Sequence, residues 1–269
     1  MSWLILAALV VLLVLLVSPF VIVVMNAFKT PSEYASGGPL EFPSGFYLDG
    51  IRALWDRIDF SQKLWNSLLI STSVAVLGVV LSVLNAYALG IGRVRGRTWL
   101  LVLFLIANTL PQEALVYPIY YASNEIGLYN SRILIIIIFT VIQSAFGTYL
   151  LSSTLSAFPR EIIEAAEMDG ATRFQVLWRV IIPISRPTLM VLFTFFFIWT
   201  WNEFFLPLIF LVTNDTQTVP VALGVLQGQR LVDATAQSAS ALLGIVPALI
   251  FFAIFQRTLA KGVTAGALK

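Results

Sequence analysis

Long apolar stretches separated by shorter polar segments are the main pattern along this chain. An α-helix needs roughly 20 apolar residues to cross a bilayer core about 30 Å thick. Six stretches reach this length, at residues 3–25, 66–90, 99–122, 132–151, 187–212 and 236–255. The pattern predicts an all-α membrane protein, with six transmembrane helices in a single transmembrane domain over residues 1–269. The largest connections are residues 26–65, in which residues 51–58 could form a short helix, and residues 152–186.

The first apolar stretch could instead be a cleaved signal peptide. No lysine or arginine precedes it, its apolar run is longer than that of a signal peptide, and no small-x-small cleavage site follows closely. We therefore expect residues 3–25 to be a retained span.

The composition supports a membrane protein and excludes several other classes. Hydrophobic residues make up 59% of the 269 residues and charged residues 11%, whereas about 25% are charged in an average soluble domain. This balance argues against a soluble enzyme, a disordered chain and a nucleic-acid partner. The chain also has no cysteine and no histidine, so we predict no catalytic residue and no metal site.

The positions of the basic residues predict the orientation. Ten of the 16 lysines and arginines lie after the second span, after the fourth span and in the C-terminal tail. The positive-inside rule places these segments, and therefore both termini, in the cytoplasm. The first span taken alone would favour the opposite orientation, because Lys29 follows it and no basic residue precedes it. We expect the five later spans to determine the orientation, unless the natural chain has a longer N-terminus.

The connection 152–186 is predicted to form two short helices with a tight corner. Pro159 suits a first helical turn, and Gly170 suits a helix C-terminus because it can adopt positive φ. The second helix is expected to end at Pro183 and to carry one apolar stripe, formed by Phe174, Leu177, Trp178 and Ile181. This segment could contact another protein, or it could be an amphipathic helix on lipid headgroups.

Two acidic residues fall within the predicted spans. Glu113 lies in the third span and Glu203 in the fifth. Acids in a membrane are energetically costly, so by default they face the interior of the bundle or a water-filled path. Pro111 and Pro207 lie close to them, and prolines often accompany bends in such helices.

The connection also carries a motif of fixed spacing. Glu164-Ala165-Ala166, three residues, Gly170, nine residues and Val180-x-Ile182-Pro183 resembles the EAA loop of ABC importer permeases. Val180 and Ile182 are mild departures from the I-x-L-P end of that pattern. The W-N-E-F segment 201–204 and the G-x-T-x-G-A tail 262–267 are similar to carbohydrate importers of the maltose and glycerol-phosphate type. Unlike many members of that group, this chain has no basic tail before its first span.

The resemblance implies the type I ABC importer permease fold in a prokaryotic plasma membrane. It implies a second homologous permease, two ATP-binding subunits and an extracytoplasmic sugar-binding protein as partners. ATP and Mg²⁺ would bind to the ATPase, and no cofactor to this chain, which lacks a G-x-x-x-x-G-K-[ST] loop. By the same resemblance, the ATPase-coupling residues would be Glu164, Ala165, Ala166, Asp169, Gly170 and Pro183.

A sugar path would use aromatic faces for stacking, and amides or carboxylates for paired hydrogen bonds to hydroxyls. Candidate residues in the third and fifth spans are Gln112, Glu113, Tyr117, Trp199, Asn202 and Glu203. The same residues could instead hold helices together or lie in an interfacial belt of aromatic residues.

Three other functions remain open from the sequence. A proton-coupled secondary transporter would have Glu113 and Glu203 as its candidate proton sites, but no inverted repeat is visible. An ABC permease for a non-sugar solute would share the EAA loop. A membrane enzyme or scaffold is disfavoured because a hydrolase would lack histidine and cysteine.

Overall fold

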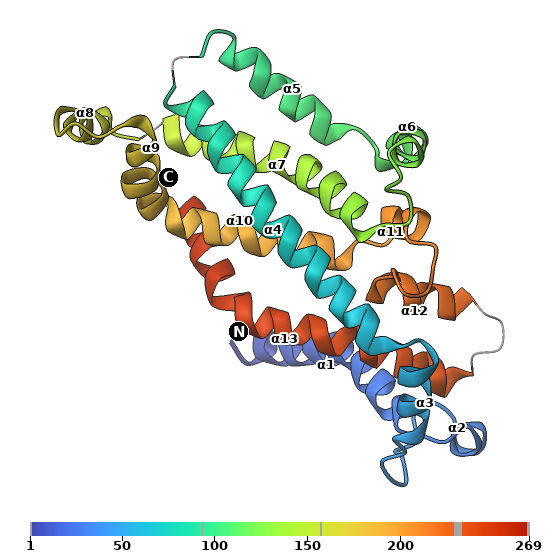
Figure 1. Cartoon of the computed structure of the whole chain (residues 1–269). Helices are drawn as coiled ribbons and strands as arrows, with labels where there is room; N and C mark the ends of the chain where they lie inside the picture. Colours follow the sequence, from blue (N-terminus) through green and yellow to red (C-terminus); the bar gives the residue numbers. More distant parts are fainter. Residues whose placement is uncertain (1, 93, 157, 229–232, 268–269) are drawn as a thin grey trace. The chain divides into compact units, whose positions relative to one another are not determined.

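The computed structural model describes residues 2–92, 94–156, 158–228 and 233–267 of the chain. All regular secondary structure in these residues is helical, which confirms the all-α prediction (Figure 1). Three of the basic residues counted for orientation, Arg93, Arg230 and Lys269, lie outside the described residues.

The helices follow one another along the whole chain. In order they are α1 (Ser2–Ala27), α2 (Pro31–Gly37), α3 (Asp49–Arg57), α4 (Phe60–Gly90), α5 (Arg97–Thr109), α6 (Gln112–Glu125), α7 (Arg132–Ser156), α8 (Arg160–Met168), α9 (Arg173–Val176), the π-helical turn η1 (Leu177–Ile181), α10 (Ile182–Asn202), α11 (Phe205–Phe210), α12 (Val219–Gly228) and α13 (Ala234–Ala267). Among the described residues, five helices are long and apolar enough to cross a membrane, or six if α5 and α6 count as one bent span.

The third predicted span is not one straight helix. It is divided between α5 and α6, which meet at an angle of 95°. The break falls at Leu110 and Pro111, where both residues adopt extended backbone. Proline disfavours helical backbone in the residue before it, so the chain turns at this point.

The chain forms two compact units. The first unit comprises Met1–Leu64 and Val219–Ala253. Its core brings the end of α1, helix α3 and the start of α4 together with α12 and the first turns of α13, through Ala27, Leu54, Ile58, Phe60, Val219, Leu223, Leu226, Ala239 and Leu243. Most apolar side chains of α1 between Trp3 and Val24 remain exposed. A helix that is apolar on all sides and unburied is suited to face lipid.

The second unit comprises Trp65–Thr218 and Ile254–Lys269. Helix α7 is its most buried span, and α4 and α10 run beside it (Figure 1). A Cβ on Gly147 would collide with the Ser82 hydroxyl and would lie 2.9 Å from the Phe196 ring. Ser82 in turn donates to the Gly78 carbonyl at 2.6 Å. Small residues therefore allow α4, α7 and α10 to approach closely, as is typical of membrane helices.

The helix at the fifth predicted span differs from the predicted bounds at both ends. Residues Arg173–Asn202 form one continuous helix, so the prediction that Pro183 ends a separate helix is wrong. The π turn explains the difference, because the Ile182 N–H donates to the Leu177 carbonyl, five residues back, and this wider turn accommodates a proline that has no N–H. At the other end the helix stops at Asn202, and the short α11 follows after a two-residue break.

Candidate functional site

A tight corner joins α8 to α9. Gly170 has a φ of +80° and donates its N–H to the Glu167 carbonyl at 3.0 Å, while Ala171 donates to the Ala166 carbonyl at 3.0 Å. These two bonds form a Schellman motif, in which a left-handed glycine closes the end of a helix. The positive φ that the sequence predicted for Gly170 is confirmed.

The next helix starts immediately after this corner. The Thr172 hydroxyl accepts the Gln175 N–H at 3.4 Å, and the Gln175 side chain accepts the Thr172 N–H at 2.7 Å. This reciprocal pair is a capping box. The Tyr87 hydroxyl of α4 also donates to the Arg173 carbonyl at 3.0 Å. The backbone of the corner is therefore fixed on both sides and tied to a spanning helix.

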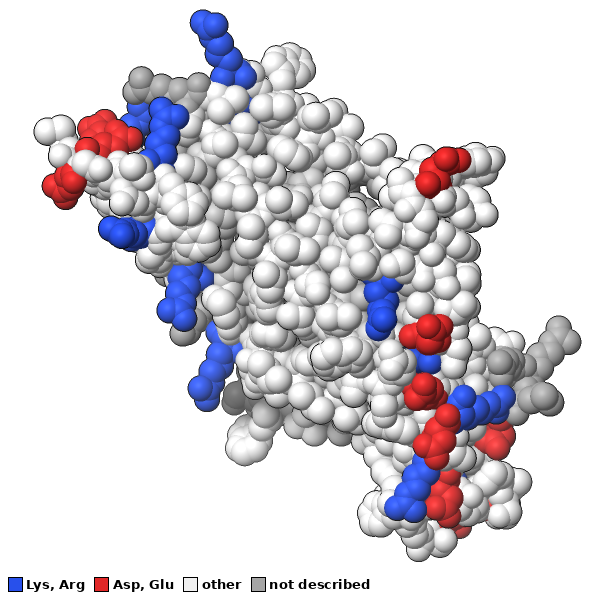
Figure 2. All heavy atoms as spheres, in the orientation of Figure 1, with Lys and Arg blue, Asp and Glu red and all other residues white. Residues whose placement is uncertain are grey.

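Helix α8 presents a free face. None of its residues is buried. At helical spacing, Glu161, Glu164, Ala165 and Met168 share one side, and all four are exposed. Figure 2 shows acidic and basic side chains gathered around this helix. Small Ala165, next to Glu164 on this open face, leaves a surface that another protein can approach closely.

The predicted apolar stripe of the second helix is only partly correct. Leu177 and Ile181 are buried, with 3% and 1% of their surface exposed, but Phe174 and Trp178 are 67% and 51% exposed. Their rings lie 5.9 Å apart. The pairs four residues apart still share a face, Phe174 with Trp178 and Leu177 with Ile181, but the wider π turn separates positions that are three residues apart. The result is an exposed aromatic pair beside the corner.

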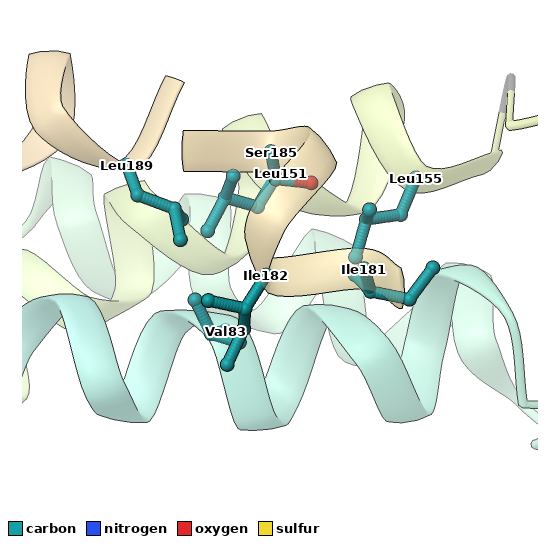
Figure 3. A pocket seen from close by; sticks show the side chains of 7 residues that line it. All are labelled: Val83, Leu151, Leu155, Ile181, Ile182, Ser185 and Leu189. Carbon is teal, nitrogen blue, oxygen red and sulfur yellow. The ribbon is translucent and has the colours of Figure 1, made fainter. Parts of the chain in front are cut away.

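The base of this helical segment packs on two spanning helices. Ile181 lies against Val83 of α4 and Leu151 and Leu155 of α7, around a small apolar gap (Figure 3). The other lining residues are Ile182, Ser185 and Leu189 of α10. The lining is aliphatic apart from Ser185, which indicates packing between helices and no ligand-binding chemistry.

The polar candidates of the third span lie at the start of α6. Gln112 is half-buried, and Glu113 is exposed. Tyr117 is 69% exposed, and its hydroxyl lies 3.1 Å from that of Tyr121. Glu113, Tyr117, Tyr121 and Glu125 recur every four residues, so they form one exposed stripe of α6. The other side of this helix packs through Val116 and Ile119 on the core of the second unit.

The candidates of the fifth span lie where α10 ends. Trp199 is 43% exposed and stacks on Phe195 at 5.6 Å. The exposed Asn202 amide donates back to the Ile198 carbonyl at 2.8 Å, and the half-buried Glu203 leaves the helix in extended backbone. In the described part of the chain, no hydrogen bond links these residues to Gln112, Glu113 or Tyr117. The structure thus gives two polar groups and not one assembled site.

The structure contains two polar links between distant segments that the sequence did not predict. Gln143 of α7 donates to the Thr200 hydroxyl of α10 at 2.8 Å. The Asn66 amide donates to the carbonyls of Asp215 and Gln217 at 2.7 and 2.9 Å and accepts from Arg132 at 2.8 Å. Asn66 at the start of a predicted span was the only sequence signal for the second link. Within the described residues, no group of three or more acidic side chains could hold a metal.

The helical fold and the apolar spans define a multi-pass membrane protein. Residues 78–265 match the family of binding-protein-dependent transport system inner membrane components, and the chain belongs to this family.

Relatives with named functions extend over almost the whole chain. The chain is 32% identical to the diacetylchitobiose uptake system permease protein DasC of Streptomyces coelicolor, over 97% of this chain and 94% of that protein. It is 31% identical to the trehalose transport system permease protein SugB of Mycobacterium tuberculosis, over 89% of this chain and 88% of that protein. A bacterial ABC transporter involved in the import of alginate has the same fold, with a TM-score of 0.82, 20% identity and 95% of both chains covered.

These relationships identify the chain at the level of the family. It is a carbohydrate ABC importer permease, a membrane subunit of a larger transport complex, and it is not an enzyme. ATP hydrolysis takes place on a separate ATPase, and permease subunits of this kind do not themselves bind cofactors.

Proposed function

We propose that this chain imports a sugar or sugar derivative and is coupled to its ATPase through the α8–α9 corner. The observation that carries the proposal is the open face of α8, which is unburied but has a backbone fixed by the Schellman motif and the capping box. A rigid exposed element can transmit a rigid-body movement from a partner. Glu164, Ala165, Ala166, Asp169 and Gly170 lie on or beside this corner, and Pro183 lies further along the same continuous helix.

The exposed aromatic pair adds to the proposed contact. Phe174 and Trp178 lie next to the corner, and Met168 is 87% exposed at the end of α8. Large apolar side chains at the centre of a polar surface are typical of protein interfaces. In this proposal the corner faces the cytoplasm, as do both termini, because ten of the 16 basic residues lie on that side. The complex contains a second homologous permease, two ATP-binding subunits and an extracytoplasmic sugar-binding protein.

We propose further that the sugar path uses α6 and the end of α10. The stripe of two tyrosines between two carboxylates can stack on a sugar ring and bond its hydroxyls. Trp199, Asn202, Glu203 and Gln112 lie at breaks in the spans, where non-helical backbone is tolerated only if it is buried in protein or lines a water-filled cavity. Sugar transport by the named relatives supports this choice of substrate.

Copurification tests the coupling contact. Ala165→Trp adds bulk to the exposed face of α8, and Ala53→Trp adds the same bulk to an exposed position of α3 as a matched control. With a tag on this chain, we expect Ala165→Trp to lose the ATPase and keep the second permease, and Ala53→Trp to keep both. Equal ATPase recovery in the two variants would refute the proposed contact.

A further inference from the structure

The segment that follows α1 folds into a closed loop over residues 28–47, referred to below as the 28–47 loop. The Tyr47 N–H donates to the Phe28 carbonyl at 3.1 Å, one residue after α1 ends at Ala27. The rings of Phe28 and Phe46 meet edge to face at 5.4 Å. Both ends of the loop are therefore held at the end of a transmembrane helix.

Two charged side chains hold the 28–47 loop together through hydrogen bonds to its backbone. The Lys29 side chain is 1% exposed, and its Nζ donates to the Gly38 carbonyl at 2.9 Å. The Glu33 carboxylate accepts the N–H of Ser44 and, at 3.4 Å, that of Thr30. These bonds hold the pKa of Glu33 below its usual range, so the carboxylate is ionised at neutral pH and keeps the loop closed.

The apolar side chains of the same loop point outward. Leu40, Phe42 and Phe46 are 71%, 78% and 82% exposed, in the segment between α2 and α3 (Figure 1). Lys29 is thus buried and the half-buried Glu33 is bonded within the loop, while three large apolar side chains are turned outward. This is the reverse of a loop in water, where exposed apolar surface is unfavourable. It fits a surface whose surroundings are apolar.

The lipid bilayer is the occupant that fits this surface. The exposed apolar surface of α1 ends only one helical turn before the loop begins. Its 26 residues extend about 39 Å, against about 30 Å of hydrocarbon and 40–45 Å including headgroups, so Ala27 falls at the interface. Residues 38–46 contain no lysine and none of the Trp, Tyr or Arg that dominate protein–protein hot spots. The single acid of the segment, Glu41, is exposed, with its carboxylate beside Gly37 of α2.

We propose that the 28–47 loop inserts Leu40, Phe42 and Phe46 into the lipid leaflet at which α1 ends. The loop then anchors the outer part of the first unit at a fixed depth in the bilayer. This proposal uses the membrane span α1 and does not depend on which side of the membrane the loop occupies.

Spin labels can measure the depth directly, because the chain has no cysteine of its own. A label is attached at Phe42→Cys in the full-length chain, in vesicles of phosphatidylethanolamine and phosphatidylglycerol. Labels at Leu12→Cys on α1 and Ala53→Cys on α3 serve as the lipid and water controls, since both positions are exposed. Accessibility to oxygen, which concentrates in lipid, is compared with accessibility to a water-soluble nickel chelate.

We expect the ratio of oxygen to nickel accessibility at position 42 to be raised above that at position 53, toward that at position 12. A ratio equal to that at position 53 would overturn the proposal. Adding the extracytoplasmic binding protein tests whether that protein, and not lipid, covers the loop. If the label at position 42 is accessible to nickel in vesicles and becomes shielded only with that protein, the loop docks on protein and the lipid proposal is wrong.

Discussion

Replacing Gly170 by alanine tests the coupling corner with a minimal chemical change. Gly170 has a φ of +80°, and a Cβ at this position would meet nothing within 4 Å. The substitution therefore adds backbone strain without a collision. An L-residue in the left-handed region costs roughly 1–2 kcal/mol, which corresponds to about a 5–30-fold change in a local equilibrium. We expect the Schellman bonds of Gly170 and Ala171 to open more often by about this factor.

Gly96→Ala provides a matched control. Gly96 also has a φ of +80°, and a Cβ added there would meet nothing within 4 Å, but this glycine precedes α5. Both variants carry the same strain and should lose similar stability in thermal unfolding. In the reconstituted complex, only Gly170→Ala should lower sugar uptake per ATP hydrolysed. A similar loss of coupling in both variants, or in neither, would refute the role of the corner.

Three further outcomes follow from packing, capping and charge. Gly147→Ala places a Cβ 2.8 Å from the Ser82 Cβ and should cost about 1–3 kcal/mol of stability. Adding Ser82→Gly should recover part of this loss in thermal unfolding. The absence of any recovery would contradict the close packing of these two residues. Asp233 accepts the Ala236 N–H at 2.7 Å at the start of α13, so Asp233→Ala should cost about 0.5–2 kcal/mol in the same assay, whereas Asp233→Asn should cost less. The pKa of Glu33 is lowered in the folded loop. The stability that Glu33 contributes is therefore complete above the usual carboxyl range and is lost as the pH falls through the lower pKa of the folded state. A spin label at Phe42→Cys should become more mobile on acidification, and unchanged mobility would contradict the closure of the loop by Glu33.

Local chemistry made part of the fold predictable from the sequence. The glycine of the corner was predicted because only glycine adopts its backbone at low cost, and the structure has Gly170 at positive φ. A short helix at residues 51–58 was expected from the sequence, and α3 occupies Asp49–Arg57. In both cases the determining interactions lie within a few residues, where sequence patterns report them directly.

Proline effects and tertiary contacts were less predictable. Pro111 and Pro183 are both prolines within apolar segments, yet one accompanies a 95° break and the other lies within a continuous helix after a π turn. The difference depends on what packs around each residue: Ile181, two positions before Pro183, is held by α4 and α7. The Gln143–Thr200 bond joins residues whose separation in sequence gives no pattern. Such contacts are properties of the packed helices and not of either segment.

The continuous helix from Arg173 to Asn202 connects the two groups of candidate residues. Its 30 residues extend about 45 Å, with the corner at one end and Asn202 and Glu203 at the other. Near its base, Ile181 packs on α4 and α7; near its far end, Thr200 is bonded to Gln143 of α7. A helix fixed at two points along α7 cannot bend freely between them, so a displacement of the corner must either move α7 with it or break the Gln143–Thr200 bond. If the corner is coupled to the ATPase, the end of α10 is therefore where its movement must become a change in the sugar path.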